Sequence, residues 1–510
     1  MFRRRYPSSS FTNPKTCFIS IQAQPKQEFI NPSIKQLVQT GQFYEALKLY
    51  IKLCNNGFKP DNFTFPYILK ASSQLTDPTL GFLIHNQTIK TGFDSNIFVA
   101  NSLILFYGKL GHLESVRYMF DKIPHRNVVT WTATISAFSQ NNRFNISIEF
   151  FRYMRILGIK PNSFTLATLL PSFSYFDQSN QIHSFLIKHG FESDIFVSTA
   201  LIDVYAKCGN TLSAKHVFDE MPERNLVSWN AICLGYNQNG NMRESLKLFT
   251  EMQKFDNFWP DSFSVVTALC SCSNLASLRE GKEIHGYVYK ANLENSVLVG
   301  NGLIDMYGKC GFLELADHVF DKMQERDVGS WTALIMCHGL HGQGVKAIEI
   351  FEKMKKTKAV TPNSVTLVAI LTACSHSCLV EDGFKYFKSL NDDFGIEPAM
   401  KHYICMVDLL GRAGLLAEAL KFINEMPVQA DSRVWEALLG SATIQGDMVV
   451  AEIAAKNLME SESENPELCV QLANIYANSG KWDDVVKIRG SLQSMKLRKS
   501  PGVSSVQVVL

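Results

Sequence analysis

The sequence predicts an all-α fold, in which short helical hairpins stack into an α-solenoid, and two observations lead to this prediction. The first is internal repetition, because segments 103–131, 201–229 and 303–331 closely resemble one another. The second is the spacing of apolar residues within each copy, which follows the i, i+3, i+4, i+7 stripe of an α-helix. One such hairpin buries its apolar face only by stacking on neighbours, so the repetition predicts an extended solenoid with a long surface.

Each copy predicts two helices joined by a tight turn. In segment 199–225 the first stripe is Leu201, Val204, Tyr205 and Cys208, and the second is Ala214, Val217, Phe218 and Met221. Gly209 stands where a helix needs a residue with left-handed backbone, and Pro222 follows the second helix. The tryptophans continue the pattern, since Trp131, Trp229, Trp331 and Trp435 recur at intervals of 98, 102 and 104 residues. No alternating strand pattern of useful length competes with this helical reading.

Composition excludes several other classes of protein. The 510 residues are 46% hydrophobic and 19% charged with a net charge of +2, which does not fit wholesale disorder or a bulk polycation. No run of 18 apolar residues occurs, so we expect no membrane span. The 12 cysteines contain no C-x-x-C pair, so we expect reduced structural thiols, no metal site and no cofactor.

The first 26 residues differ in composition from the rest of the chain. They contain three arginines, two lysines and many hydroxyl residues, and the first acidic residue is Glu28. An arginine-rich, acid-free start is typical of a mitochondrial or chloroplast transit peptide. We therefore expect residues 1–26 to be a transit peptide, with a disordered tail as the alternative.

Three kinds of unit ending cycle along the chain, such as FKPD to Asp61, GFDSN to Asn96 and PHRN to Asn127. Hairpins with W-[TN]-A openings and K-P-[DN] closings resemble pentatricopeptide repeats, and the cycle resembles the P-L-S class of plant organelles. By that layout the P-type units are 27–61, 128–162, 226–261 and 328–363, the L-type units are 62–96, 163–194, 262–296 and 364–399, and the S-type units are 97–127, 195–225, 297–327 and 400–431. The segments 434–440 and 472–485 are similar to two E motifs. The resemblance implies a right-handed α-solenoid of twelve repeats over 27–431, an E-motif region over 432–499 and a tail over 500–510.

The resemblance also implies a function, the sequence-specific binding of single-stranded RNA at one base per repeat. In that family the fifth and last residues of a repeat contact the base edge, through the distinct donors and acceptors of short polar side chains. The corresponding pairs are Asn31/Asp61, Asn101/Asn127, Thr132/Asn162, Thr199/Asn225, Asn230/Asp261, Asn301/Asp327, Thr332/Asn363 and Ile404/Asp431. Ile404 departs from the pattern because it has no hydrogen-bonding group. The alternative interpretation is that these residues only cap helices at unit junctions.

Two further sets of residues follow from the same layout. The fifth residues of the L-type units are Pro66, Ala167, Val266 and Val368, which cannot hydrogen-bond a base and are expected to act as spacers. Lys109, Lys207, Lys309 and Arg412 end the first helix of the four S-type units, where the family resemblance implies RNA phosphate contacts. Capping of the helix C-terminus by a cation is the alternative.

We expect no catalysis. The segment His112-Leu113-Glu114 matches the H-x-E part of a zinc deaminase signature by chance, since no C-x-x-C accompanies it. The resemblance implies a site-recognition factor for C-to-U RNA editing that recruits a deaminase and accessory proteins through residues 432–499. The alternatives are an organellar splicing or stability factor and a tetratricopeptide-like protein scaffold. We expect no small-molecule substrate, and a mitochondrial location with the chloroplast as the alternative.

Overall fold

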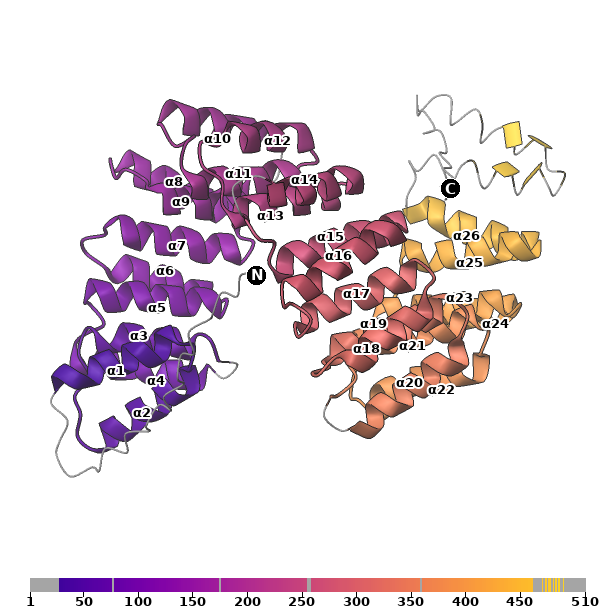
Figure 1. Ribbon diagram of the computed structural model, residues 1–510, viewed down its shortest axis with the longest axis horizontal. Helices are drawn as coiled ribbons and strands as arrows, with labels where there is room; N and C mark the ends of the chain where they lie inside the picture. Colours follow the sequence, from indigo (N-terminus) through magenta and orange to yellow (C-terminus); the bar gives the residue numbers. More distant parts are fainter. Residues whose placement is uncertain are drawn as a thin grey trace, which may run out of the picture. The chain divides into compact units, whose positions relative to one another are not determined.

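The computed structural model describes residues 27–461, except 76–77, 174–175, 255–257 and 358–359, together with scattered positions between 470 and 489. These residues form 26 α-helices and one short 3₁₀ helix, with no strand among them, which confirms the predicted all-α class (Figure 1). The predicted transit segment 1–26, much of the second E motif and the tail 500–510 lie outside the described residues.

The chain divides into two compact blocks, residues 1–223 and 224–510, and each is a stack of helical hairpins. The N-terminal block contains α1 (Gln27–Gln39), α2 (Phe43–Asn55), α3 (Thr64–Ser72), α4 (Thr79–Thr91), α5 (Ile97–Lys109), α6 (Leu113–Lys122), α7 (Val128–Gln140), α8 (Phe144–Ile156), α9 (Ser163–Leu169), η1 (Leu170–Ser172), α10 (Phe176–Lys188), α11 (Ile195–Lys207) and α12 (Thr211–Glu220). The C-terminal block contains α13 (Leu226–Gln238), α14 (Met242–Lys254), α15 (Ser262–Leu275), α16 (Leu278–Lys290), α17 (Val297–Lys309), α18 (Leu313–Lys322), α19 (Val328–Leu340), α20 (Gly344–Thr357), α21 (Ser364–His376), α22 (Val380–Asp392), α23 (Met400–Arg412), α24 (Leu416–Asn424), α25 (Ser432–Gln445) and α26 (Met448–Ser461).

Within each block the odd-numbered helices form one layer and the even-numbered helices the other (Figure 1). In the N-terminal block, α5 contacts α3 and α7 along its own layer and packs on α6, its partner in the hairpin. In the C-terminal block, α17 contacts α15 and α19 and packs on α18 in the same way. The first helices of successive repeat units therefore lie next to one another in each block.

The local structure of a hairpin follows from its apolar stripes and its turn glycine. In α11 the stripe residues Leu201, Val204 and Tyr205 are buried, and Cys208 at the helix end is half-buried. Gly209 has φ +77°, the left-handed conformation expected after a helix, which a residue with a Cβ adopts at a cost. Helix α12 then begins at Thr211 and ends two residues before Pro222, as the sequence predicts.

Adjacent first helices approach very closely at one glycine in each of several units. A Cβ built on Gly308 of α17 would lie 2.6 Å from the Sγ and 3.1 Å from the Cβ of Cys337 on α19. Gly108 of α5 meets Ala137 of α7 in the same way, with a Cβ-to-Cβ distance of 2.6 Å. These distances are too short for two side chains, so the glycine sets how near the first helices of neighbouring units lie.

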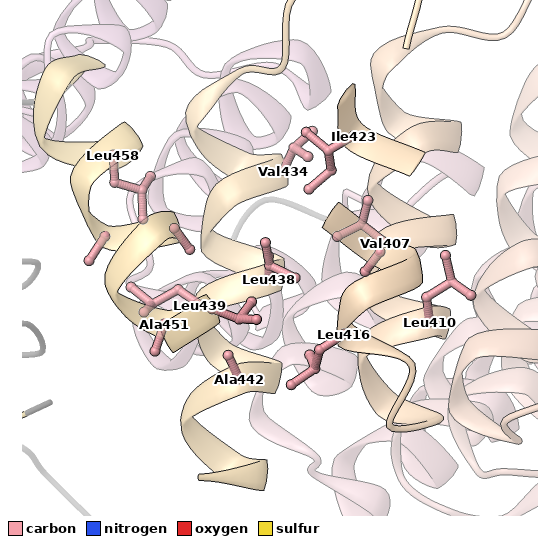
Figure 2. Close-up of a cluster of buried hydrophobic side chains, with 14 of the residues drawn as sticks. Val407, Leu410, Leu416, Ile423, Val434, Leu438, Leu439, Ala442, Ala451 and Leu458 are labelled. Atoms are coloured by element: carbon pink, nitrogen blue, oxygen red, sulfur yellow. The ribbon is translucent and has the colours of Figure 1, made fainter. Parts of the chain in front are cut away.

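The last described helices share one buried apolar cluster. Figure 2 shows Val407 and Leu410 of α23, Leu416 and Ile423 of α24, Val434, Leu438, Leu439 and Ala442 of α25, and Ala451 and Leu458 of α26. Helices α23 and α24 fall in the predicted unit 400–431, and α25 and α26 fall in the predicted region 432–499. The helices α25 and α26 therefore continue the stack of hairpins through the same kind of packing.

Candidate nucleic-acid interface

The last residue of each P-type and S-type unit caps the first helix of the next unit. Its side-chain Oδ1 accepts a hydrogen bond from the backbone N–H three residues later, at 2.8 to 3.3 Å, which satisfies one of the free donors at a helix start. The residues are Asp61, Asn127, Asn162, Asn225, Asp261, Asp327, Asn363 and Asp431. The capping alternative therefore describes one atom of each side chain.

In five of the eight capping residues the second polar side-chain atom remains available. Five of the capping residues are exposed and have no hydrogen bond at their outer Nδ2 or Oδ2 atom to any described residue: Asn127, Asn162, Asp261, Asp327 and Asn363. An asparagine presents a donor there, and an aspartate presents an acceptor. The cap and an outward hydrogen bond thus use different atoms of one side chain.

Three residues meet at the junctions that follow the four P-type units and unit 297–327: the fifth and last residues of one unit and the third residue of the next. We call these three residues a junction cluster. In the cluster Asn31, Asp61 and Thr64, the Asn31 Nδ2 donates to Asp61 Oδ2 at 3.0 Å. The Thr64 hydroxyl lies 2.8 Å from Asn31 Oδ1 and 2.7 Å from Asp61 Oδ1. The structure therefore brings together a fifth and a last residue that are 30 positions apart in the sequence.

The junction cluster Asn230, Asp261 and Ser264 repeats this arrangement. Asn230 Nδ2 lies 3.3 Å from Asp261 Oδ1, and the Ser264 hydroxyl lies 2.6 Å from Asn230 Oδ1 and 2.8 Å from Asp261 Oδ1. The Ser264 backbone N–H also donates to Asp261 Oδ1 at 2.9 Å. Both third residues, Thr64 and Ser264, are buried, so the inner side of each cluster is shielded from solvent.

Clusters with threonine as the fifth residue use a hydroxyl-to-hydroxyl contact instead. Thr132 Oγ1 lies 2.7 Å from the hydroxyl of Thr165, which also donates to Asn162 Oδ1 at 2.8 Å. The second such cluster is Thr332, Asn363 and Thr366, with corresponding distances of 2.8 and 3.1 Å. The third residue links the fifth and last residues in these clusters as well.

In two S-type units the fifth residue is an asparagine whose side-chain oxygen, Oδ1, has no hydrogen-bond partner. Asn301 Nδ2 donates to Asp327 Oδ1 at 3.1 Å, but the buried Asn301 Oδ1 has no partner, and the same is true of Asn101 Oδ1. Thr199 and Asn225 belong to different blocks, and Thr199 bonds the carbonyl of Ile195 on its own helix. Their geometry as a pair is therefore not described.

The pair Ile404/Asp431 is not equivalent to the others. Ile404 packs against the apolar cluster of Figure 2, and the third residue of the next unit is Val434, which has no hydroxyl. The guanidinium of Arg433 donates to Asp431 Oδ2 from Nε at 3.0 Å and from Nη2 at 2.5 Å. Both oxygens of Asp431 are thus occupied within the protein.

An arginine fastens the turn before two of the S-type last residues. Arg126, next to Asn127, donates from Nε to the carbonyl of Phe120 at 2.9 Å, and its guanidinium lies 4.5 Å from the Phe120 ring centroid. Arg326, next to Asp327, makes the same two contacts with Phe320, at 2.9 and 4.7 Å. These contacts hold the turn after the second helix and thereby fix the position of the capping residue.

The acid groups in the clusters are ionised at neutral pH. Burial alone would raise the pKa of Asp327, but hydrogen bonds from Ser330 and Asn301 outweigh this and hold the pKa below its usual value. Asp61 and Asp261 have lowered pKa values for the same reason, with Thr64/Asn31 and Ser264/Asn230 as the donors. Each of these carboxylates is therefore a strong acceptor.

Sequence reasoning missed the second residue of each unit, which is large, apolar and 45% to 63% exposed in nine units. These residues are Phe63, Phe98, Val129, Phe164, Phe196, Val227, Phe263, Leu298 and Val365. They lie two positions after the last residue of the preceding unit, and the rings of Phe164 and Phe196 in neighbouring units lie 5.6 Å apart. An apolar side chain beside a polar pair is suited to contact the face of a planar base, and only the pair Asn301/Asp327 is followed by a glycine, Gly329, among the hydrogen-bonded pairs. The sequence signal that could have revealed these residues is an apolar residue that lies outside the buried apolar stripe of its helix.

The predicted phosphate contacts are exposed, but each has a partner. Lys207 pairs with Asp203 at 2.6 Å, Lys309 with Asp305 at 3.1 Å and Arg412 with Asp408 at 2.8 Å, always one helical turn earlier. Lys109 instead donates to Gln74 at 2.6 Å. Three of the four cations are thus partly neutralised by a carboxylate that sequence reasoning overlooked.

The fifth residues of the L-type units, which were predicted to act as spacers, carry no polar side chain. Pro66, Ala167, Val266 and Val368 are half-buried fifth residues of the L-type units and have no side-chain hydrogen-bonding group. Among the described residues there is no group of three or more histidine, cysteine or acidic residues that could hold a metal ion. No helix in that part of the chain is long and apolar enough to cross a membrane.

The stacked hairpins with a recurring polar cluster at their junctions define a helical-repeat protein. Comparison with family models specifies which kind: the PPR repeat family model matches residues 126–174 and 326–376. The PPR repeat model matches 196–226, 227–257, 301–328 and 401–429, and the E motif model matches 446–507. The chain belongs to the pentatricopeptide repeat family, as its residues had indicated.

Relatives from Arabidopsis thaliana agree with this assignment. One putative pentatricopeptide repeat-containing protein is 37% identical over 476 residues, covering 91% of this chain and 84% of the relative. Another, named as mitochondrial, is 37% identical over 91% of this chain and 73% of its own length. A third, named as chloroplastic, is 35% identical over 94% of this chain and 55% of its own length. The chain spans 65% of the length of a further relative, so some family members are considerably longer.

Solved structures share the fold. The crystal structure of the pentatricopeptide repeat protein PPR10 from maize matches with a TM-score of 0.58 at 17% identity, covering 93% of this chain and 69% of that chain. PPR10 in complex with an 18-nt psaJ RNA element matches with a TM-score of 0.60 at 16% identity, covering 91% and 73%. This likeness establishes the α-solenoid fold.

Proposed function

We propose that this protein binds single-stranded RNA and reads one base with each P-type or S-type unit, and that it does so without catalysis. The observation that carries the proposal is the junction cluster, in which a capping side chain keeps one polar atom free beside an exposed apolar residue. Polar edge contact and apolar face contact are the two elements of single-stranded base recognition. The RNA complex of PPR10, a protein of the same fold, supports this choice of ligand.

The fifth and last residues of the P-type and S-type units together imply an RNA target sequence. We read Asn with Asp as U, Asn with Asn as C or U, and Thr with Asn as A, with the RNA running parallel to the chain. With n at each L-type unit and at the unit containing Ile404, the target is 5′-UnCAnAUnUAnnnnnC-3′. The final C, four nucleotides beyond the unit 400–431, is the base to be changed.

We propose further that the protein is a site-recognition factor for C-to-U editing in a plant organelle. The E motif at 446–507 supports a recruiting role, in which a deaminase and accessory proteins bind residues 432–499. The mitochondrial and chloroplastic names of relatives support an organelle, and we propose the mitochondrion. On this proposal residues 1–26 are the transit peptide, and 27–431 are the twelve RNA-binding repeats.

Two measurements test the proposal. The full chain is mixed with a randomised single-stranded RNA pool and the bound RNA is sequenced; the expected result is enrichment of the target pattern. Organellar RNA is sequenced from plants that lack the protein; the expected result is an unedited C downstream of that pattern, restored by the wild-type gene. Enrichment with unchanged editing but altered splicing or transcript abundance would favour the non-editing alternative, and no enrichment would refute specific binding.

A further inference from the structure

We infer that the third residue of each following unit is a positioning residue for base reading, because its buried hydroxyl and N–H decide which polar atom of the preceding last residue faces the RNA. This inference rests on the proposed function and adds to it a residue type that touches no base. The residues are Thr64, Thr130, Thr165, Ser264, Ser330 and Thr366. Ser228 acts through its N–H alone, because its hydroxyl donates to the backbone carbonyl of Asn225.

The first step in the argument is the direction of the hydrogen bonds. In the cluster around Asp261, the Ser264 N–H and hydroxyl both approach Oδ1, at 2.9 and 2.8 Å. At Asn162, the Thr165 N–H and hydroxyl approach Oδ1 at 2.9 and 2.8 Å. A backbone N–H is only a donor, so the atom facing it must be an oxygen. An asparagine amide flipped by 180° would set its NH₂ against that donor.

The second step is the consequence for the outer atom. With Oδ1 held inward, an asparagine such as Asn162 can present only its NH₂ donor, and an aspartate such as Asp261 only its Oδ2 acceptor. Cytosine and adenine carry an acceptor at the central ring nitrogen of the Watson–Crick edge, whereas uracil and guanine carry an N–H donor there. The cap thus converts the choice between Asn and Asp into a choice between two classes of base.

The third step is the link to the fifth residue. The Ser264 hydroxyl lies 2.6 Å from Asn230 Oδ1, and this contact turns the Asn230 amide so that its Nδ2 lies 3.3 Å from Asp261 Oδ1. The Thr64 hydroxyl orients Asn31 in the same way, and Thr165 contacts the hydroxyl of Thr132. In the clusters of the four P-type units, one buried hydroxyl therefore orients both residues of a reading pair, whereas the hydroxyls of Thr130 and Ser330 contact the last residue alone.

The last junction shows the opposite case within the same chain. Its third residue is Val434, its fifth residue is Ile404, and its last residue, Asp431, binds Arg433 through the outer Oδ2. Where the hydroxyl is absent, the fifth residue is apolar and the outer atom is occupied. The third-residue hydroxyl and the polar fifth residue are thus both absent from this junction, and both are present in the clusters around Asp61 and Asp261.

The test compares base preference in variants of the full chain, by selection from a randomised single-stranded RNA pool. Ser264→Ala keeps the backbone N–H but removes the hydroxyl, and Ser264→Thr keeps both. Ser271→Ala is the matched control, because Ser271 is a buried serine on the same helix whose hydroxyl bonds Asn237, outside any junction cluster. Asp261→Asn serves as the reference change of the reading residue itself.

We expect wild type to prefer U over C at the nucleotide of unit 226–261, by roughly 5- to 100-fold if one matched base behaves as in other readers. Ser264→Ala should reduce this ratio about fivefold or more, the equivalent of one lost hydrogen bond, while Ser264→Thr and Ser271→Ala leave it unchanged. Asp261→Asn should reverse the preference towards C. Thr64→Val preserves the shape of the side chain and should likewise reduce the base preference at the nucleotide of unit 27–61. This variant tests the inference if Ser264→Ala does not fold.

The outcomes separate the two levels of the proposal. If Asp261→Asn leaves the preference unchanged, or if no motif is enriched, base reading by these pairs is wrong and the inference fails with it. If Asp261→Asn reverses the preference but Ser264→Ala and Thr64→Val discriminate as well as wild type, base reading stands and the positioning role is refuted. A loss of thermal stability with an unchanged ratio in both variants would give the third residue a structural role only.

Discussion

Replacement of Gly308 by alanine should destabilise the contact between α17 and α19 despite improving the helix propensity of α17. The new Cβ would lie 2.6 Å from Cys337 Sγ and 3.1 Å from Cys337 Cβ. Overpacking of this kind costs about 1–3 kcal/mol, whereas exchanging glycine for alanine within a helix gains up to about 1 kcal/mol. The net expectation is a loss of about 0.5–2 kcal/mol.

A second glycine in the same block isolates the clash from the propensity effect. Gly286 lies in α16, and a Cβ there meets nothing within 4 Å, so Gly286→Ala should stabilise its helix by about 0.5–1 kcal/mol. The double variant Gly308→Ala/Cys337→Ala removes the sulfur and should recover part of the loss. A coupling of about 1 kcal/mol between the two positions is expected for residues in direct contact.

Hydrogen exchange is the suitable assay, since repeat proteins open locally and their stability is not a single number. We expect faster exchange in α17 and α19 for Gly308→Ala, and slower exchange in α16 for Gly286→Ala. Equal effects of the two substitutions, or no coupling with Cys337→Ala, would refute the close approach of the first helices.

Four further outcomes are expected. Asn301→Thr combined with Asp327→Asn should shift the preference of unit 297–327 from U to A by about 1–3 kcal/mol in binding titrations, and equal binding of both RNAs would show that these residues are only caps. Asp305→Asn releases Lys309 from its ion pair, so RNA binding should tighten and its dependence on log salt should steepen by roughly 0.7, whereas Lys309→Gln should not steepen it; an unchanged slope in Asp305→Asn counts against phosphate contact. Because hydrogen bonds hold the folded pKa values of Asp61, Asp261 and Asp327 below the usual value of an aspartate, the stability that these carboxylates contribute is complete at neutral pH and is lost as the pH falls through the lowered folded pKa values. Asp327→Asn should weaken this acid sensitivity in a pH series of thermal unfolding, and an identical loss of stability at acid pH in wild type and variant would contradict the prediction. Finally, the triple variant Ile404→Asn, Arg433→Val and Val434→Ser should create a junction cluster at Asp431 and a new preference for U in the selected RNA. Ile404→Asn alone should not create this preference. No base preference at the nucleotide of unit 400–431 in the triple variant would argue that a cluster is insufficient for base reading.

The helices were predictable because buried stripes repeat in the sequence at helical spacing. The stripe residues Val204 and Tyr205 and the positive φ of Gly209 needed no knowledge of tertiary structure. The close approach at Gly308 was not predictable, since a glycine within a helix does not say which side chain will face it. The partner, Cys337, lies 29 residues further along the chain.

The candidate site was predictable only in part. The reading pairs came from a family resemblance, and the structure brings Asn31, Asn230 and Asn301 within hydrogen-bond distance of their aspartates. The hydroxyl of Ser264 went unnoticed because a serine in the first turn of a helix is common and its second contact, to Asn230, spans 34 residues. The pairing of Lys309 with Asp305 could have been found from their i, i+4 spacing.

Each junction cluster contains residues from two successive repeats. The segment that carries one base preference is therefore shifted along the chain relative to the repeat that forms one helical hairpin. A recombination that transplants residues 226–261 carries Asn230 and Asp261 but leaves Ser264 with the recipient. A segment running from the fourth residue of one repeat to the third residue of the next, here 229–264, transfers the whole cluster. Duplication, shuffling and laboratory grafting should therefore preserve a base preference best when their breakpoints fall inside the first turn of a helix and not in the loop between repeats.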